Sequence, residues 1–401
     1  MSTMRIAFIT SEFATEGSTA GGLGTYMRRI TRALCDAGHT PEVFVTSRSS
    51  AGTSVINGVT VHTVKVTTAD RGMRKALNWL LVRLFREVWS GPAGYVNHAW
   101  HLSRAFHARE RQVDFAFVQS TNCAGCGLLI RKKRGRPHLM RLSSKRDLWF
   151  EADGRQGPGF SAMSSMERMA AGRADRVYAP SRFLARECTE QWGIQTDVLR
   201  PPAFIDTDPA REIPCKLPAR FMVHFGSFAA RKGSVVLARA LRRVWEQVPG
   251  FEMVWCGTWA DDAVRRECRE LFAGHAARIH LTGPLKKEVL YAVIRTSVAA
   301  VLPSRVDNLP NTVIESLLLE RPVIGTLDSS IDELVQDRVT GLLVENNSEK
   351  DLADAIVRLW NNPLVFNADA VYSRPVFKMM EPAVAADSLA CFRFEDSAAG
   401  R

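Results

Sequence analysis

Short apolar runs alternate along the chain with stretches in which apolar residues recur at helical spacing. This alternation is typical of parallel α/β architecture. In the first half the predicted strands are residues 5–10, 41–47, 59–66, 114–119, 138–143 and 175–181. The predicted helices are 23–38, 73–89 and 181–193. The first helix ends at Gly38, a residue type favoured just past a helix terminus.

Proline density rises and periodicity is lost over residues 201–218, which we interpret as a linker. A second alternating series follows. Its predicted strands are 220–226, 251–257, 277–283, 297–303, 321–326 and 340–345, and its predicted helices are 233–247, 261–272, 286–294, 311–319, 331–336 and 348–361.

The pattern therefore predicts two doubly wound, Rossmann-like α/β domains with parallel sheets. We expect an N-terminal domain over 1–200 and a C-terminal domain over 219–361, with a tail, 362–401, that packs back on the N-terminal domain. In such sheets ligands bind at the carboxyl ends of the strands, so we expect the chemistry in a cleft that both domains face.

Composition fits a soluble globular protein: 46% of the 401 residues are hydrophobic and 24% are charged. No apolar run approaches the roughly 18 residues of a spanning helix, and the apolar core of "MSTMRIAFITSEF" is too short for a signal peptide. Eight scattered cysteines fit a reduced compartment, so we expect a cytoplasmic protein.

The net charge of +11 is uneven, because residues 1–200 carry +13 and residues 201–401 carry −2. This excess indicates that the first half meets an anionic surface or acceptor. The amphipathic stretch 73–89 has two readings, core packing or contact with an anionic membrane surface. The basic run "RKKRGRP" at 131–137 lacks interleaved aromatics and leads into a strand, which favours a solvated connection over nucleic-acid binding.

Two short motifs suggest metal chemistry only weakly. Cys123 and Cys126 have the spacing of half a zinc site, but no second pair completes it, and the small residues around them predict a tight turn. The triplet "DTD" at 206–208 falls in the predicted linker, which disfavours a metal-dependent site there.

A basic loop follows the first strand of the second domain. The strand is predicted to end at Phe225, and Arg231 and Lys232 precede a helix that begins near Gly233. Cations at a strand end can neutralise a diphosphate. The loop is equally well read as an ordinary connection with two solvated charges.

The stretch "DNLPNTVIE" contains two carboxylates, Asp307 on a loop and Glu315 one turn into a helix that Asn311 is expected to cap. Free N–H groups at that helix start favour a phosphate or sugar oxygen, and Glu315 can accept hydrogen bonds from a ribose diol. The alternative is a capped helix with an acid in its first turn. Ser330 and Glu333 have the spacing of a capping box.

In the first domain Gly22 and Gly24 follow a strand by about ten residues, too far for a dinucleotide fingerprint. A flexible glycine loop over an acceptor fits this spacing better.

Together these features resemble the retaining glycosyltransferases of the GT-B fold, family 4. The resemblance runs from residue 4 to about 361 through "GGLGTYMRRITRALCDAGHTPEVF", "ADRVYAPSRFLARECTEQWGI", "HFGSFAARKGSVVLARAL", "IHLTGPLKKEVLYAVIRTSVAAVLPS", "DNLPNTVIE" and "RPVIGTLDSSIDELVQDRVTGLLVEN". Each piece is weak alone, and the order and spacing of all of them carry the resemblance.

The resemblance implies roles for individual residues. Glu315 would hold the ribose of a sugar nucleotide, Asp307 would contact the transferred sugar, and Lys232 would bind the diphosphate. The main chain of Asn308, Leu309, Pro310 and Asn311 would line the sugar and phosphates, and that of Gly283 to Leu285 would read the base. Gly22 and Gly24 would lie near the diphosphate and acceptor.

The chain departs from the family at three places. Asp307 replaces the usual glutamate, Ser227 replaces the arginine after the donor-side glycine Gly226, and Ser143 replaces a histidine. Arg231 could substitute for the missing arginine. Donors for the missing histidine could come from the neighbours of Ser143, Arg141 and Lys145.

The resemblance implies a metal-independent hexosyltransferase without a cofactor. It would transfer a sugar from a UDP- or GDP-linked donor to a saccharide or lipid-linked acceptor in surface polysaccharide or glycolipid assembly, at the inner face of the cell membrane. A GT-B-like sugar-nucleotide epimerase and, in another class, a basic nucleic-acid-binding protein remain the alternatives.

Overall fold

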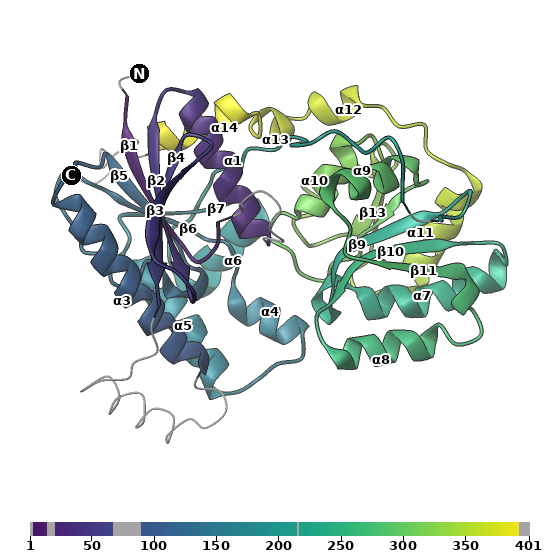
Figure 1. The fold of residues 1–401 in the computed structure, drawn as a ribbon. Helices are drawn as coiled ribbons and strands as arrows, with labels where there is room; N and C mark the ends of the chain where they lie inside the picture. Colours follow the sequence, from purple (N-terminus) through teal and green to yellow (C-terminus); the bar gives the residue numbers. More distant parts are fainter. Residues whose placement is uncertain (1–2, 14–20, 67–89, 215, 393–401) are drawn as a thin grey trace. The chain divides into compact units, whose positions relative to one another are not determined.

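The computed structural model describes residues 3–13, 21–66, 90–214 and 216–392. The chain forms two compact units, one of residues 1–202 with 379–401 and one of residues 203–378 (Figure 1). The predicted helix at 73–89 lies outside the described residues, so neither reading of it is tested. None of the described helices is long and apolar enough to cross a bilayer.

The first unit has an eight-stranded sheet in the order β3-β4-β2-β1-β5-β6-β7-β8. All neighbouring strands are parallel except β3 and β4. The strands are β1 Arg5–Thr10, β2 Thr40–Ser47, β3 Gly52–Ile56, β4 Val59–Lys65, β5 Phe117–Thr121, β6 His138–Arg141, β7 Arg176–Ala179 and β8 Asp197–Val198. The helices are α1 Gly22–Asp36, α3 Ser90–Glu110, α4 Arg146–Ala152, α5 Pro158–Arg173, α6 Arg182–Trp192 and α14 Pro382–Phe392.

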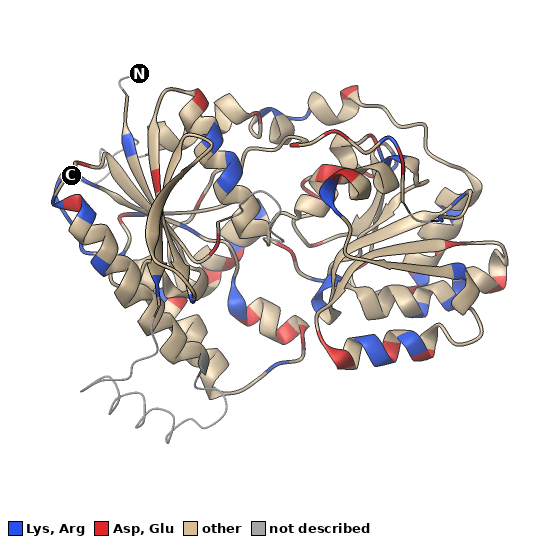
Figure 2. Ribbon diagram, in the orientation of Figure 1, with Lys and Arg blue, Asp and Glu red and all other residues tan. Residues whose placement is uncertain are grey.

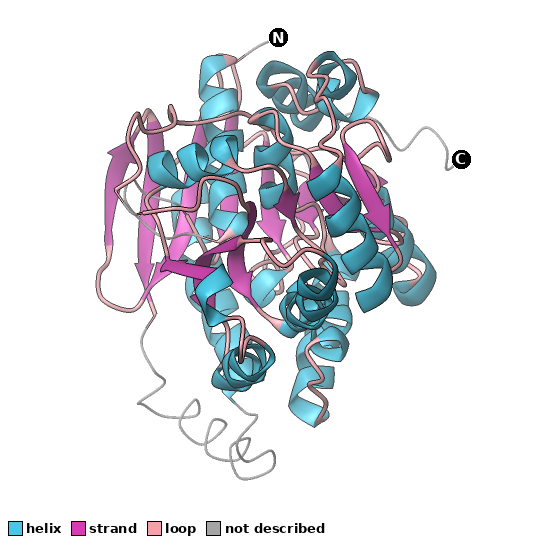
Figure 3. Ribbon diagram, turned by 90° about the vertical axis from the view of Figure 1, so that its right-hand side faces the viewer, coloured by secondary structure: helices cyan, strands magenta, loops and turns pink. Residues whose placement is uncertain are grey.

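Strand β1 shows how this sheet is buried on both faces. Ile6 and Phe8 pack with residues of α1 and α14, whereas Ala7 and Ile9 pack with residues of α3. Figure 3 draws the strands of the chain in magenta and its helices in cyan. A central parallel strand covered on two sides reads as a continuous apolar run, which is why "RIAFIT" is recognisable from sequence.

The second unit has a six-stranded parallel sheet in the order β11-β10-β9-β12-β13-β14. Its strands are β9 Met222–Phe228, β10 Met253–Trp259, β11 Ile279–Gly283, β12 Ala300–Val301, β13 Val323–Thr326 and β14 Gly341–Val344. Its helices are α7 Ser234–Gln247, α8 Asp262–Leu271, α9 Lys287–Thr296, α10 Asn311–Leu318, α11 Glu349–Asn361, α12 Asp369–Tyr372 and α13 Pro375–Lys378. The strand order reverses between β9 and β12, as in a doubly wound Rossmann sheet. The predicted fold class is thus confirmed.

Two boundaries differ from the expected ones. Residues 203–218 cluster with the second unit, because Ala210 N–H donates to Glu288 O at 2.9 Å and Thr207 contacts the Glu288 carboxylate. The tail divides at Met379, since residues up to Lys378 belong to the second unit, and Arg374 donates to the carbonyls of Glu333 and Leu334 there. Helix α14 belongs to the first unit and packs on α1.

Some elements were mispredicted or missed. Residues 331–336 form turns and not a helix. Strand β3 and helices α3, α4 and α5 were not predicted, since β3 is largely exposed and α3 and α5 are only weakly amphipathic. The basic run 131–137 is a turn held by acids, in which Arg136 Nε lies 2.6 Å from Glu110 and Lys132 lies 3.5 Å from Asp175.

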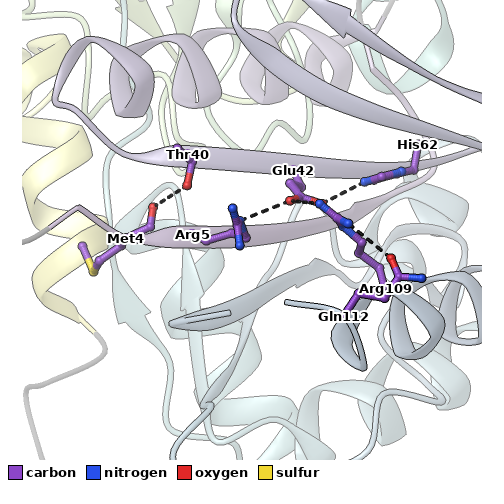
Figure 4. Close-up of polar contacts among 7 residues, drawn as sticks. All are labelled: Met4, Arg5, Thr40, Glu42, His62, Arg109 and Gln112. Carbon is purple, nitrogen blue, oxygen red and sulfur yellow. Dashed lines mark hydrogen bonds and ion pairs between the residues drawn. The ribbon is translucent and has the colours of Figure 1, made fainter. Parts of the chain in front are cut away.

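A buried carboxylate on β2 joins three elements of the first unit (Figure 4). Glu42 accepts from Arg109 of α3 at 2.9 and 3.0 Å, contacts His62 of β4 at 2.9 Å and lies 3.3 Å from Arg5 of β1. Burial alone would raise the Glu42 pKa, but the hydrogen bonds from His62 and Arg109 and their charges lower it to about 2.

We expect Glu42→Ala to lower the free energy of unfolding by about 2–3 kcal/mol, because it leaves Arg109 without its buried partner. The lowered pKa adds a pH dependence: the contribution of Glu42 is complete above pH 4.5, its ordinary value, and is lost as pH falls towards 2. Urea unfolding of wild type and Glu42→Gln between pH 5 and pH 2 measures this, with the exposed Glu190→Gln as control. Equal acid sensitivity of wild type and Glu42→Gln would contradict it.

Candidate functional site

Two loops of the second unit meet where the order of its strands reverses. One follows β9 and contains a 3₁₀ turn, Ala230–Lys232, and the other follows β12. Arg305 N–H donates to Arg231 O at 2.8 Å, and Gly233, with φ of 72°, lies so close to Pro303 that an added Cβ would fall 1.9 Å from its carbonyl oxygen. This is the position at which a doubly wound sheet binds its ligand.

Lys232 and Asp307 are brought into direct contact by these loops. Lys232 Nζ donates to Asp307 Oδ2, and Asp307 Oδ1 accepts from the N–H of Asn308 at 3.0 Å. Asp307 is buried, whereas the Lys232 side chain is 28% exposed and so remains within reach of a ligand. A cation and a carboxylate are therefore held side by side at the carboxyl edge of the sheet.

The predicted capping box at Ser330 and Glu333 is wrong. No helix forms there, and Ser330 Oγ donates instead to the carbonyl oxygen of Asp307 at 2.9 Å. Thr326 Oγ1 similarly donates to Ser304 O at 2.6 Å. These hydroxyls thus fix the main chain of the Asp307 loop from the neighbouring strand β13 and the turn that follows it.

Helix α10 begins at this loop with no side-chain cap. Pro310 and not Asn311 is the capping residue, and Asn311 is the first helical residue, so the predicted cap is wrong. Proline locks φ and cannot accept through a side chain, so the first amides of α10 keep their capacity to bind an anion. Gly226, at φ of 112°, lies beside this first turn. A Cβ added to Gly226 would lie 3.5 Å from Thr312 Cγ2.

Glu315 of α10 is buried in a cluster of polar side chains. Its Oε1 lies 3.1 Å from the Tyr291 hydroxyl and 3.5 Å from Lys287 Nζ. The same hydroxyl lies 3.1 Å from Asp206, and Lys287 Nζ donates to both Asp206 oxygens at 2.7 and 2.9 Å. Two carboxylates thus share one ammonium and one phenol, and Asp206 belongs to this cluster rather than to a linker.

A cavity of about 600 Å³ lies at the carboxyl ends of β9, β10 and β11. Gly283 forms part of its wall, as do Phe228, Trp259, Arg265 and Arg269. Trp259 packs edge-on against Phe228 at 5.1 Å, and Arg265 and Arg269 come from α8, whose basic residues Figure 2 shows along the helix. Leu285 follows Gly283 in the connection to α9. The cavity thus combines aromatic surface with charged groups of both signs, since Asp261 and Asp262 also line it.

In the first unit Gly22 and Gly24 occupy the first turn of α1, so they lie in a helix and not in a flexible loop. Residues 14–20 of the preceding connection lie outside the described part of the chain. Arg141, at the carboxyl end of β6, lies over the ring of Tyr26 of α1 at 3.8 Å and donates to Ser143 Oγ at 2.7 Å. The structure thus brings Arg141 and Ser143 to the start of α1.

Lys145 does not serve as a further donor beside Ser143. It is buried, and its amine donates to Gln191 and lies 3.1 Å from Asp147. Cys123 and Cys126 are free thiols: Cys123 lies in the 3₁₀ turn Cys123–Gly125 and Cys126 directly follows it. Arg146 donates to Cys123 Sγ at 3.4 Å. Within the described residues no three His, Cys, Asp or Glu side chains gather as a metal site would require.

Two family models match the chain: the glycosyl transferase 4-like domain over residues 21–203 and the glycosyl transferases group 1 over residues 219–362. The chain belongs to the glycosyltransferases. The two matched segments fall on the first and second units, and GT-B glycosyltransferases are found among proteins of similar fold.

Alpha-D-kanosaminyltransferase of Streptomyces kanamyceticus is 26% identical over 144 residues, which span 35% of this chain and only 36% of that enzyme. D-inositol 3-phosphate glycosyltransferase of Rhodococcus erythropolis is 26% identical over 384 residues, covering 88% of this chain and 82% of that one. Sucrose-phosphate synthase of Thermosynechococcus elongatus superposes with a TM-score of 0.73 at 18% identity, covering 98% of both chains.

Gly233 provides a test of how closely the two loops must approach. We expect Gly233→Ala to lower the free energy of unfolding by about 3 kcal/mol, because the added Cβ meets backbone and φ is positive. Gly274→Ala is the matched control in the same unit: its φ is 81°, but nothing lies within 4 Å of the added Cβ. It should cost only about 1 kcal/mol. If Gly233→Ala and Gly274→Ala lower the free energy of unfolding equally in thermal or urea unfolding, the close approach is contradicted.

Proposed function

We propose that this protein is a retaining glycosyltransferase of family 4. It transfers a hexose from a UDP- or GDP-linked sugar to a saccharide or lipid-linked acceptor. The observation that carries the proposal is the convergence of Lys232, Asp307 and the uncapped start of α10 where the second sheet reverses its order. A cation, a carboxylate and free helix amides are the groups that a sugar diphosphate needs at one place.

The leaving group determines the first requirement of the chemistry. When the anomeric bond breaks, negative charge develops on the diphosphate, and Lys232, Arg231 and the amides of Asn311 and Thr312 would stabilise it. Lys232 already neutralises Asp307 in the free protein, so the diphosphate adds a second anionic partner to the same ammonium. The geometry therefore supports departure of a nucleoside diphosphate.

The sugar determines the second requirement. Positive charge develops at the anomeric carbon, and the Asp307 carboxylate, held by Asn308 N–H and Lys232, is the anion available to stabilise it. Retention follows either from attack by Asp307 or from attack of the acceptor on the face that the diphosphate leaves. Both routes use the same residues of the second unit.

Glu315 would bind the ribose and the cavity beside Gly283 the base. The Glu315 carboxylate can accept from vicinal hydroxyls. The cavity offers Trp259 as an apolar surface, with Arg265 and Arg269 as donors to base carbonyls. Its volume of about 600 Å³ is within the range of small-molecule sites.

Arg141 and Ser143 of the first unit would contact the acceptor, with Gly22 and Gly24 near by. The first 200 residues carry a net charge of +13, which suits a phosphorylated or lipid-diphosphate acceptor at an anionic membrane surface. We therefore place the reaction in surface polysaccharide or glycolipid assembly, on the cytoplasmic side of the membrane.

Glu315→Gln tests the donor site. Losing the charge weakens the hydrogen bonds from the ribose, which to a charged group are worth about 1.5–3 kcal/mol, so nucleoside diphosphate affinity should fall about 10- to 100-fold. A thermal-shift panel of UDP-, GDP- and ADP-sugars on the wild type identifies the donor, and titration calorimetry then compares the variants. The exposed Glu345→Gln is the control and should bind like the wild type. Unchanged affinity in Glu315→Gln would remove Glu315 from the site.

We expect transfer to continue in EDTA, because Lys232, Arg231 and the start of α10 supply the positive charge that stabilises the diphosphate. Lys232→Ala should lower kcat about 100-fold or more, on the scale of removing one preorganised charge stabiliser. Product release by the wild type is followed with and without EDTA, and the anomeric configuration of the product is read by NMR. Loss of turnover in EDTA that Mg²⁺ restores would overturn metal independence, and an inverted product would overturn retention.

A further inference from the structure

Helix α5 of the first unit places a carboxylate, Glu167, entirely inside the protein. Glu167 is 0% exposed, and three donors point at it: Tyr95 Oη at 2.9 Å, Arg146 Nε at 3.2 Å and Asn122 Nδ2 at 3.0 Å. They come from α3, α4 and the turn after β5. A buried ion pair contributes little to stability compared with apolar packing, so this arrangement calls for another explanation.

Asn122 transmits the influence of Glu167 to the main chain. An ionised carboxylate only accepts hydrogen bonds, so the amide of Asn122 must turn its Nδ2 towards Glu167. Its Oδ1 then faces the other way and accepts from Ser143 N–H at 2.7 Å, while Nδ2 also donates to Ser144 O at 2.5 Å. Glu167 thereby fixes the path of residues 143 and 144 after β6.

The main chain at Ser143 in turn positions the side chains assigned to the acceptor. Ser143 Oγ accepts from Arg141, whose guanidinium lies over Tyr26 of α1. Tyr26 is held by Gln119 Oε1 and by the Tyr178 hydroxyl, both at 3.1 Å. A continuous set of hydrogen bonds and one stacking contact therefore runs from α5 to the start of α1.

We propose that Glu167 is a positioning residue: its ionised carboxylate, acting through Asn122, sets the Ser143 loop and with it Arg141 for the acceptor. The assignment of an acceptor to this loop rests on the proposed function. The positioning of the loop itself rests only on the contacts described above.

Protonation of Glu167 would disrupt this arrangement. A protonated carboxyl gains an O–H donor and loses acceptor capacity, and two of the groups facing it, the Arg146 guanidinium and the Asn122 amide nitrogen, can only donate. Cys123 is another titratable group packed here, and its Sγ accepts a hydrogen bond from Arg146. Burial raises the pKa of Glu167 to about 7, with the Arg146 charge opposing the rise, so the change falls in an accessible pH range.

The raised pKa has opposite effects on stability and on the loop. Because the folded protein holds the proton more tightly than the unfolded chain, whose pKa is near 4.5, Glu167 favours folding below pH 4.5, and this contribution is lost as pH rises to about 7. The loop, in contrast, is organised as the carboxylate ionises. Acceptor turnover should therefore rise through pH 7 while the Glu167 contribution to stability falls.

Glu167→Gln is the test, because it keeps the shape and removes both the charge and one acceptor. At pH 8 we expect faster hydrogen–deuterium exchange over residues 142–146, where Ser143 N–H loses its fixed partner. We also expect a roughly tenfold higher KM for acceptor, an unchanged Kd for the nucleotide and no acid limb near pH 7 in the pH profile. Glu151→Gln, exposed on α4, is the matched control. Asn122→Ala should reproduce the exchange result with Glu167 intact, and it serves if Glu167→Gln fails to fold.

Wild-type exchange at 142–146 in both Glu167→Gln and Asn122→Ala would overturn the proposal, whatever the activity. A variant that loses nucleotide affinity as well would also overturn it, since that indicates general disruption. If the wild type transfers no sugar from any donor, the proposed function fails, but the exchange measurement still decides whether Glu167 positions the loop.

Discussion

The hydrogen bond from Arg305 N–H to Arg231 O is the interaction on which the candidate site of the second unit depends. It joins the loop after β9 to the loop after β12, which are adjacent only because the sheet reverses its strand order there. His224 of β9 lies next to this junction. Its Nδ1 is 2.8 Å from Val301 O, and its Nε2 is 3.3 Å from Ser234 Oγ at the start of α7. Burial lowers the His224 pKa to about 4, so the ring is neutral and can bridge a carbonyl and a hydroxyl.

Buried charge is balanced locally in both units. Glu42 and Glu167 each lie inside the first unit with an arginine, and Asp206 and Glu315 share Lys287 in the second. The pKa values of Glu42 and Glu167 differ because their partners differ in number and kind. Glu42, with Arg109, His62 and Arg5, has a lowered pKa, whereas full burial prevails at Glu167 and raises it. The same residue type thus stays ionised until the pH falls to about 2 at one place and titrates near pH 7 at another.

Sequence reasoning succeeded where position along a strand determines position in space. Lys232 and Asp307 each follow a central parallel strand, so their approach follows from topology, and the confirmed fold class comes from the same alternation. It failed where a side chain makes a hydrogen bond to a residue far away in the sequence. Ser330 has the spacing of a helix cap but donates to Asp307 O. Asn311 was expected to cap α10, but Pro310 occupies the capping position.

The residues that sequence reasoning missed have a common cause. Glu167 lies on a helix whose periodicity is weak, and its partners Tyr95, Asn122 and Arg146 lie on three other elements. Asp206 was read as part of a linker because proline-rich sequence flanks it. Asp206, the first residue of the "DTD" triplet, accepts hydrogen bonds from Lys287 of α9 instead.

The single hydroxyl hydrogen of Tyr291 cannot be donated to Asp206 and Glu315 at the same time, although the oxygen lies 3.1 Å from each. A ligand that takes up the acceptor capacity of Glu315 releases that hydrogen, and part of the Lys287 charge, to Asp206. Asp206 lies near the start of the second unit, where the chain has just left the first. If Glu315 binds the donor as proposed, donor occupancy and the contacts of Asp206 are therefore thermodynamically linked. Reciprocity then requires that a change which strengthens the contacts of Asp206 strengthens binding of a ligand at Glu315 by the same free energy.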